Sequence, residues 1–372
     1  MRSLIALKMV IHDRSSTIGS LLGVVAIVFL VGQQLSIFFG LLNYMSVLVD
    51  HGNADLWVMS ENIRNADSGN FISGRYIDRI IGLPEVDWAE PILIGNGLFR
   101  TPNGSYENVR VVGTKRPKLF MGPWQFEKSD ERVLLDLESI TVDSLDLDKL
   151  GNPPIDYITE INGKRVIVRG ITKGARGFQG TLIFAPLEKV RDIAKIPPGR
   201  YSAILVKLKD VNKEEAIKKI RTILPKCSVY SKEELSKMTK IYYITNTGIG
   251  GSFGFSTMIA VLIGVVIITL TMYTSILGRT KDFAVIRAIG GRRKDIAVII
   301  ISEIAIIVIS GVIIGFAILA TYLNFTRNVE IPNYFPIFVI PALALGTIVV
   351  SFLGGLIALR VALKADPASV FH

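Results

Sequence analysis

Four long apolar stretches constrain the fold of this chain more than any other feature of its sequence. They cover residues 18–42, 253–277, 296–323 and 335–359, and Glu303 is the one charged residue inside them. A helix needs about 20 apolar residues to cross a hydrocarbon core of ~30 Å. Each stretch is long enough, so we expect four membrane-spanning helices.

Positive charge predicts the orientation of these helices. The segment 278–295 carries six cations against two anions, and further lysine and arginine residues lie in 1–16 and 360–372. Short cationic segments beside membrane helices stay in the cytoplasm. We therefore expect both termini and the 278–295 segment inside the cell, and residues 44–252 outside it.

The net charge of +10 does not indicate a nucleic-acid partner, because the excess cations border the apolar stretches, where they set topology. The single cysteine, Cys227, excludes an intramolecular disulfide, and we expect its thiol to be buried and unreactive. These observations predict the following order of segments: cytoplasmic N-terminus 1–16, first span 17–43, extracytoplasmic domain 44–252, second span 253–277, cytoplasmic segment 278–295, third span 296–323, outer loop 324–334, fourth span 335–360 and cytoplasmic C-terminus 361–372.

The outer segment has the alternating pattern of a mixed α/β domain. We expect strands at 54–59, 91–99, 107–114, 202–209 and 226–230, with helices at 73–83 and 213–224. These elements come from both ends of the segment, so they predict one compact subdomain with a second, of about residues 115–200, inserted into it. Strands inside the insertion are expected at 133–137, 164–171 and 181–186.

Both membrane-proximal ends of the outer domain have helical patterns. The pattern of the first span continues to about Asp50, and residues 231–245 predict a helix with Ser231 as its N-cap and Glu234 completing a capping box. We expect these two helices to form a stalk. A glycine cluster follows, which indicates either a hinge or the close approach of neighbouring helices. Its members are Gly248, Gly250, Gly251 and Gly254.

The cytoplasmic segment 278–295 has the pattern of a short amphipathic helix. Phe283, Ile286 and Ile289 recur at helical spacing among its cations. A loop that only reversed the chain direction would not need this apolar row, so we expect it to pack against another cytoplasmic protein. The alternative is a basic helix that rests on anionic lipid at the membrane surface.

Three stretches of sequence together resemble the MacB/FtsX-like permeases, the membrane subunits of type VII ABC transporters. They are RTKDFAVIRAIGGRRKDI (279–296), Glu303 early in the third span, and the terminal ADPASVF (365–371). Asp282 stands where this family usually has glutamate, and it keeps the charge. The layout is closer to DevC-like stand-alone permeases than to MacB, which carries a fused ATPase. The resemblance implies a bacterial inner-membrane protein with four helices and a MacB-like periplasmic core domain of porter and sabre-like subdomains.

In such permeases the cytoplasmic segment is a coupling helix that docks an ATPase. The resemblance implies this role for Arg279, Lys281, Asp282, Phe283, Val285, Ile286, Arg287, Ile289 and Gly290. The chain has no G-x-x-x-x-G-K-[ST] phosphate loop, and its nearest imitation, GITKGARGFQG (170–180), is interpreted as an ordinary loop. We therefore expect no catalytic residues, metal or cofactor in this chain, with ATP and magnesium bound by a separate ATPase subunit.

Three polar residues lie inside the expected spans. A charged residue in a membrane helix marks a functional site by default. We instead favour a structural role for Glu303, which either reaches the cytoplasmic interface or pairs with Arg292 or Arg293. For Gln33 and Gln34 we expect interhelical hydrogen bonds in a dimer rather than a contact with substrate.

The function expected from these features is that of a permease subunit in an ABC-type export complex. Its partners would be the ATPase, a second copy or a related permease, membrane lipid and a periplasmic adaptor protein. The alternative is an FtsX-like regulator of an extracytoplasmic enzyme that transports nothing. A membrane-anchored binding domain without energy coupling is a third reading, which leaves the cytoplasmic segment unexplained. The substrate does not follow from the fold.

Overall fold

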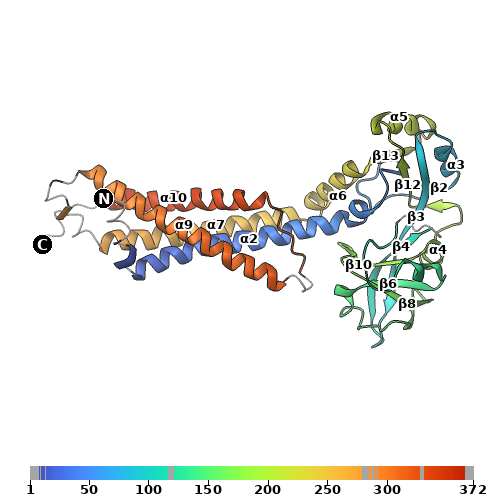
Figure 1. The fold of residues 1–372 in the computed structure, drawn as a ribbon, viewed down its shortest axis with the longest axis horizontal. Coiled ribbons are helices and arrows are strands. Elements are labelled where there is room, and N and C mark those ends of the chain that lie inside the picture. The colour runs from blue at the N-terminus through green and yellow to red at the C-terminus, as the bar shows by residue number, and fades with distance from the viewer. Residues whose placement is uncertain are drawn as a thin grey trace. The chain divides into compact units, whose positions relative to one another are not determined.

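The computed structural model describes residues 8, 10–12, 14–115, 121–278, 285–286, 290, 292–326 and 331–364. The chain forms two compact units, one helical and one of mixed α/β structure (Figure 1). The helical unit comprises Met1–Gly40 and Gly251–His372, and the α/β unit comprises Leu41–Gly250.

Four helices in the described part of the chain are long and apolar enough to cross a membrane. They are α2 (Arg14–His51), α7 (Ile249–Gly278), α9 (Arg293–Phe325) and α10 (Val339–Lys364). The four expected spans are thereby confirmed as helices. The last one begins at Val339 rather than at residue 335, because Pro332 and Pro336 disfavour helical backbone in the residues that precede them.

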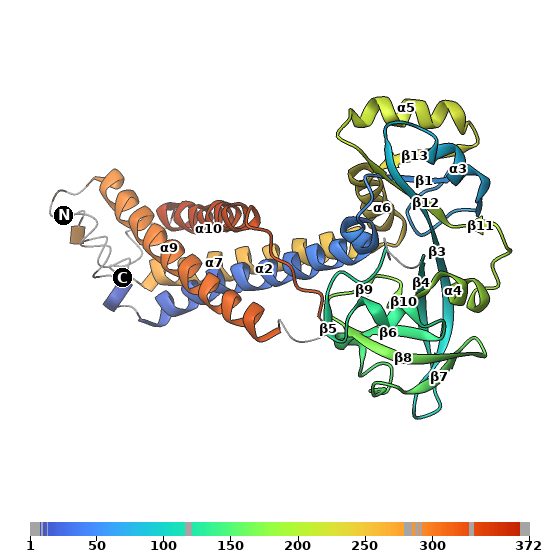
Figure 2. The ribbon, with the colours of Figure 1, turned by 45° about the vertical axis from the view of Figure 1, so that its right-hand side comes forward.

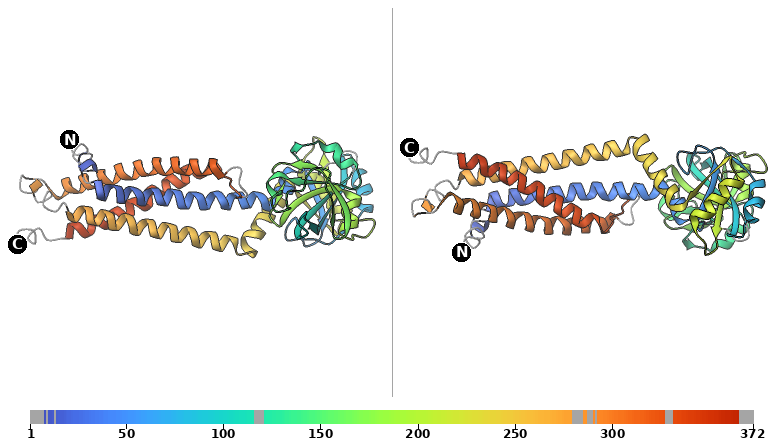
Figure 3. Two further views of the ribbon diagram at one scale, coloured as in Figure 1. Left: turned by 90° about the horizontal axis from the view of Figure 1, so that it is seen from below. Right: turned by 90° about the horizontal axis from the view of Figure 1, so that it is seen from above.

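Small residues allow these helices to pack closely, as is usual between membrane helices. Gly315 of α9 lies against Val28 of α2, where an added Cβ would come within 2.7 Å of the valine Cβ. An added Cβ at Gly264 of α7 would come still closer to the Ile27 side chain of α2. Buried apolar side chains from all four helices form one cluster, and the two views of Figure 3 show the helices side by side.

The α/β unit is built from short strands and three longer ones. Their bounds are β1 (Leu56–Ser60), β2 (Ile72–Ser73), β3 (Val86–Arg100), β4 (Tyr106–Thr114), β5 (Phe126–Lys128), β6 (Ser139–Asp143), β7 (Ile158–Ile161), β8 (Lys164–Thr172), β9 (Arg176–Gly177), β10 (Gly180–Pro186), β11 (Arg200–Tyr201), β12 (Ala203–Leu208) and β13 (Cys227–Ser231). Within the described residues, eleven of them form one sheet whose main path is β13–β1–β12–β3–β4–β10–β6–β8–β5. β2 and β11 form a separate pair.

Strand β3 joins the two halves of this sheet (Figure 2). Its first part pairs with β12 and its second with β4, since its 15 residues are long enough to reach both. Helix α5 (Lys213–Ile223) covers the half that contains β13 and β1, and α4 (Leu187–Ile193) packs on the other half. The expected insertion therefore continues the same sheet. The 107–114 strand, expected in the first subdomain, belongs to the second half, because β4 pairs in parallel with β10.

Most of the expected strands and helices are present within a few residues, including helix α3 (Arg75–Ile81). The prediction of a strand at 133–137 is wrong. These residues lie in and just after the 3₁₀ helix η1 (Glu131–Leu135), and the Asp130 carboxylate accepts a hydrogen bond from the Arg132 N–H at 2.9 Å. A side-chain cap of this kind starts a helical turn in place of a strand. A second short turn, η2 (Ser144–Asp146), follows β6.

Candidate functional site

The cationic segment 278–295 is partly described by the structure. Val285 and Ile286 are helical, and Gly290 has a positive φ of +98°, which favours glycine. Val285 is 61% exposed, whereas Ile286 is half-buried against the apolar cluster of the helical unit. The other expected coupling residues lie outside the described residues: Arg279, Lys281, Asp282, Phe283, Arg287 and Ile289.

Helix α9 begins directly after this segment. The Asp295 carboxylate accepts a hydrogen bond from the Arg292 N–H at 2.9 Å, and a negative charge is favourable in the first turn of a helix. Glu303 lies ten residues beyond Arg293, which is about 15 Å along the helix axis. Its side chain is only 3% exposed. The structure therefore places Glu303 inside the helical unit.

The two glutamines of α2 are half-buried. Among the described residues, neither the Gln33 nor the Gln34 side chain has a hydrogen-bond partner. An amide in a membrane has no water to replace that partner, so it gains from a donor or acceptor on another chain.

The glycine cluster has one residue with unusual backbone. Gly248 has φ +75°, and it separates α6 (Lys232–Asn246) from α7. This left-handed conformation is accessible to glycine without strain, so the helical path breaks there. Gly250 lies within α7, where an added Cβ would contact Ile244, while Gly251 and Gly254 have open space around them.

The end of α2 and helix α6 are joined by polar contacts within the α/β unit. The Lys240 ammonium pairs with the Asp50 carboxylate at 3.1 Å, and the Lys232 ammonium donates to the Gly52 carbonyl at 2.9 Å. The Ser231 hydroxyl accepts from the Glu234 N–H at 3.1 Å, which confirms the expected N-cap of α6. These contacts support the interpretation of both segments as a stalk.

The glycine-containing segment 170–180 is the end of β8, a loop, β9 and a tight turn that leads into β10. Its turn residue Phe178 donates its N–H to the Tyr44 carbonyl of α2 at 3.2 Å. Its ring also meets the Tyr243 ring of α6, with centroids 4.9 Å apart. Sequence reasoning missed these contacts, because nothing in the spacing of the segment indicates that it touches two helices.

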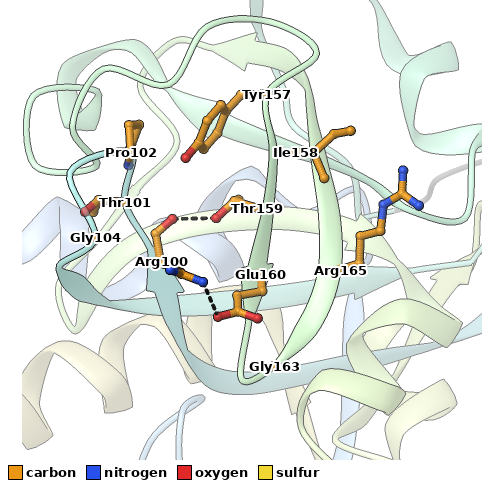
Figure 4. A pocket seen from close by; sticks show the side chains of 10 residues that line it. All are labelled: Arg100, Thr101, Pro102, Gly104, Tyr157, Ile158, Thr159, Glu160, Gly163 and Arg165. Atoms are coloured by element: carbon orange, nitrogen blue, oxygen red, sulfur yellow. Dashed lines mark hydrogen bonds and ion pairs between the residues drawn. The ribbon is translucent and has the colours of Figure 1, made fainter.

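A cavity of about 390 Å³ opens between the β3–β4 hairpin and β7 (Figure 4). Its charges are paired within the domain: Arg100 lies 3.4 Å from Glu160, and Arg165 lies 3.4 Å from Glu138. The Thr159 hydroxyl donates to the Arg100 carbonyl. Over the described residues there is no group of histidine, cysteine and carboxylate side chains that could hold a metal ion.

Four apolar helices combined with a large mixed α/β domain define a polytopic membrane protein. Residues 17–223, more than half of the chain, match the MacB-like periplasmic core domain family, and residues 254–367 match the FtsX-like permease C-terminal family. The chain therefore belongs to the MacB/FtsX-like permeases.

Solved structures with similar folds include two extracytoplasmic domains. The periplasmic region of MacB from Actinobacillus actinomycetemcomitans has 14% identity and a TM-score of 0.38, covering 50% of this chain and 92% of that one. The extracellular domain of the noncanonic ABC-type transporter YknZ from Gram-positive bacteria has 12% identity and a TM-score of 0.36, covering 48% and 99%. None of the curated proteins matches the chain.

Proposed function

We propose that this chain is the permease subunit of an ABC-type export complex. A separate ATPase subunit, which binds ATP and magnesium, docks on the cytoplasmic segment and drives movement of the α/β unit on the outer side of a bacterial inner membrane. Movement of that unit then extracts or expels a substrate. This scheme requires no catalytic residue in the permease itself.

The observation that carries this proposal is the FtsX-like match, which spans α7, the cationic segment and α9. Val285 supports a docking role for this segment, because an apolar side chain that is 61% exposed beside cations gains free energy when a partner covers it. Ile286 supports it differently. Its contact with the helical cluster connects the segment to the spans.

A dimer completes the proposal. Helix α7 has a continuous stripe of exposed apolar side chains: Phe255 (61% exposed), Met258 (56%), Leu262 (59%), Val266 (55%) and Leu270 (60%). These positions recur at helical spacing and so form one face. A second copy, or a related permease, that covered this face would also provide hydrogen-bond partners for Gln33 and Gln34 of α2.

Docking is tested with a matched pair of variants in the tagged full-length chain. Val285→Asp places a charge where the ATPase would bind, while Ile11→Asp changes a residue of equal exposure, 62%, near the N-terminus. Purification from native membranes should recover an ATP-hydrolysing subunit with wild type and Ile11→Asp. Val285→Asp should recover less than one-tenth of that ATPase subunit. The variant loses the apolar contact of Val285 and buries a charge in the interface, and together these weaken binding by more than about 2 kcal/mol.

Equal recovery of the ATPase with both variants would refute docking at this segment. The subunits that accompany the ATPase distinguish the two outputs. A periplasmic adaptor supports export, whereas a peptidoglycan hydrolase supports the FtsX-like regulatory role.

A further inference from the structure

The turn between β9 and β10 lies where three parts of the α/β unit meet. It consists of Phe178 and Gln179, and Gly180 leaves it with φ +136°. Phe178 contacts α2 through its N–H and α6 through its ring, as described above. Gln179 adds polar contacts that no local pattern in the sequence predicts.

Gln179 belongs to a closed ring of hydrogen bonds among four segments. Its amide nitrogen donates to the Tyr243 hydroxyl of α6 at 2.7 Å, and that hydroxyl donates to the Asp67 carboxylate in the loop before β2. Asp67 pairs with Arg110 of β4 at 2.7 Å, and Arg110 donates back to the Gln179 amide oxygen. Each end of the Gln179 amide therefore has a specified partner.

The ring is partly buried: Tyr243 and Arg110 lie inside the domain, whereas Asp67 is half-buried and Gln179 is exposed. Tyr243 is 2% exposed and Arg110 is 5% exposed. Opening the ring would leave the buried Tyr243 and Arg110 side chains short of hydrogen-bond partners, which favours the closed ring. Burial and the neighbouring Asp67 carboxylate raise the pKa of Tyr243, so its hydroxyl keeps the proton that it donates.

The base of the turn is fixed as well. The Arg176 guanidinium lies 2.8 Å from the Asp146 carboxylate of η2 and 5.6 Å from the centre of the Tyr44 ring of α2. A second bond holds the same face of α6, since the Ala66 N–H donates to the buried Thr239 hydroxyl at 2.9 Å. The last turns of α6 are thus held at two successive positions on one face.

We propose that the Phe178–Gln179 turn is a clamp that fastens the end of α2 and the last turns of α6 to the sheet. These helix segments then move with the α/β unit as one body, and the second stalk helix pivots at Gly248, five residues after the clamped Tyr243. The sequence of the glycine cluster indicates either a hinge or the close approach of helices, and the clamp assigns the hinge to Gly248 alone. The inference rests on the proposed function only for the source of the force.

Hydrogen–deuterium exchange of the full-length chain in lipid nanodiscs tests the clamp without any partner. Tyr243→Phe removes the central hydroxyl of the ring, and Gln179→Ala removes the turn amide. Tyr242→Phe is the matched control, because in the described part of the chain the Tyr242 hydroxyl has no hydrogen-bond partner. Amide exchange across residues 237–246 should rise about tenfold in both clamp variants, the effect of losing a hydrogen bond to a buried or charged partner.

Exchange in α5 and in the Tyr242→Phe variant should stay at the wild-type rate. Unchanged exchange of α6 in both clamp variants would overturn the proposal. An equal rise over the entire α/β unit would also overturn it, because that result indicates general destabilisation. Gln179→Ala, which alters a turn, keeps the test available if Tyr243→Phe does not fold.

The same variants separate this inference from the proposed function. A wild-type chain that binds no ATPase would remove the source of force and leave the exchange result standing. In a complex that does hydrolyse ATP, Tyr243→Phe should retain hydrolysis and lose the nucleotide-dependent change in exchange of the α/β unit. Retention of that change would show that the clamp does not transmit the movement.

Discussion

Gly40→Ala tests the packing that fixes the connection between α9 and α10 to α2. A Cβ at position 40 would lie 2.0 Å from the Pro332 carbonyl oxygen and 2.4 Å from its carbon. Both are backbone atoms, so no side-chain rotation relieves the overlap. The connection must move away, and this movement breaks the hydrogen bond from the Tyr334 N–H to the Ser36 carbonyl at 3.2 Å.

The magnitude follows from three contributions. Overpacking costs about 1–3 kcal/mol, and a lost hydrogen bond costs about 1 kcal/mol. Alanine is better than glycine within a helix by about 0.5–1 kcal/mol. The net expectation is a helical unit that is about 2 kcal/mol less stable. Gly251→Ala is the matched control, since this helical glycine has nothing within 4 Å and should gain only the propensity term.

The assay is unfolding by sodium dodecyl sulfate in mixed micelles, followed by far-ultraviolet circular dichroism. Gly40→Ala should unfold at a lower detergent fraction than wild type, and Gly251→Ala at an equal or slightly higher one. If both variants shift in the same direction by the same amount, the close approach of α2 to Pro332 is wrong.

The remaining predictions concern a thiol, a carboxyl group and a helix face. Burial raises the pKa of Cys227 to about 11, so maleimide should label it only after unfolding; rapid labelling of the folded chain would contradict its burial. Burial also raises the pKa of Asp143 in the folded domain above the value of about 4 that it has in the unfolded chain. The stability that Asp143 contributes is therefore fully present below that pH, and it is lost as the pH rises through the pKa of the folded state. The unfolding temperature of Asp143→Asn should not show this decrease with rising pH, and an unchanged decrease would exclude Asp143 as its source. With Cys227 replaced by serine, oxidation should link Met258→Cys of α7 into dimers but not Ile313→Cys of α9, which is 65% exposed; linkage of both would argue against a specific face.

The spans and many local elements could be predicted from the sequence, because the signals that define them are local. Hydropathy over 20 residues is enough to identify α2, α7, α9 and α10. The N-cap at Ser231 is likewise a local signal, because it joins two residues three positions apart, Ser231 and Glu234. The 133–137 stretch failed because its apolar composition suits a strand, while the preceding Asp130 caps a 3₁₀ turn.

The clamp could not be predicted, because its members are distant in sequence. Asp67, Arg110, Gln179 and Tyr243 come from a loop, a strand, a turn and a helix, and only the tertiary fold brings them together. The same holds within the cationic segment 278–295. Helical spacing groups Ile286 with the expected docking residues, yet the packing of the helical unit turns it inward and leaves Val285 exposed.

The most direct test of the account measures the distance between two copies of the α/β unit in the assembled complex. A spin label at Lys218→Cys, an exposed position of α5, reports this distance by electron double resonance with Cys227 replaced by serine. In nanodiscs that contain the permease and its ATPase, ATP should shift the distance distribution, and Val285→Asp should abolish the shift. An identical distribution with and without ATP, while hydrolysis proceeds, would contradict the claim that nucleotide turnover moves this unit.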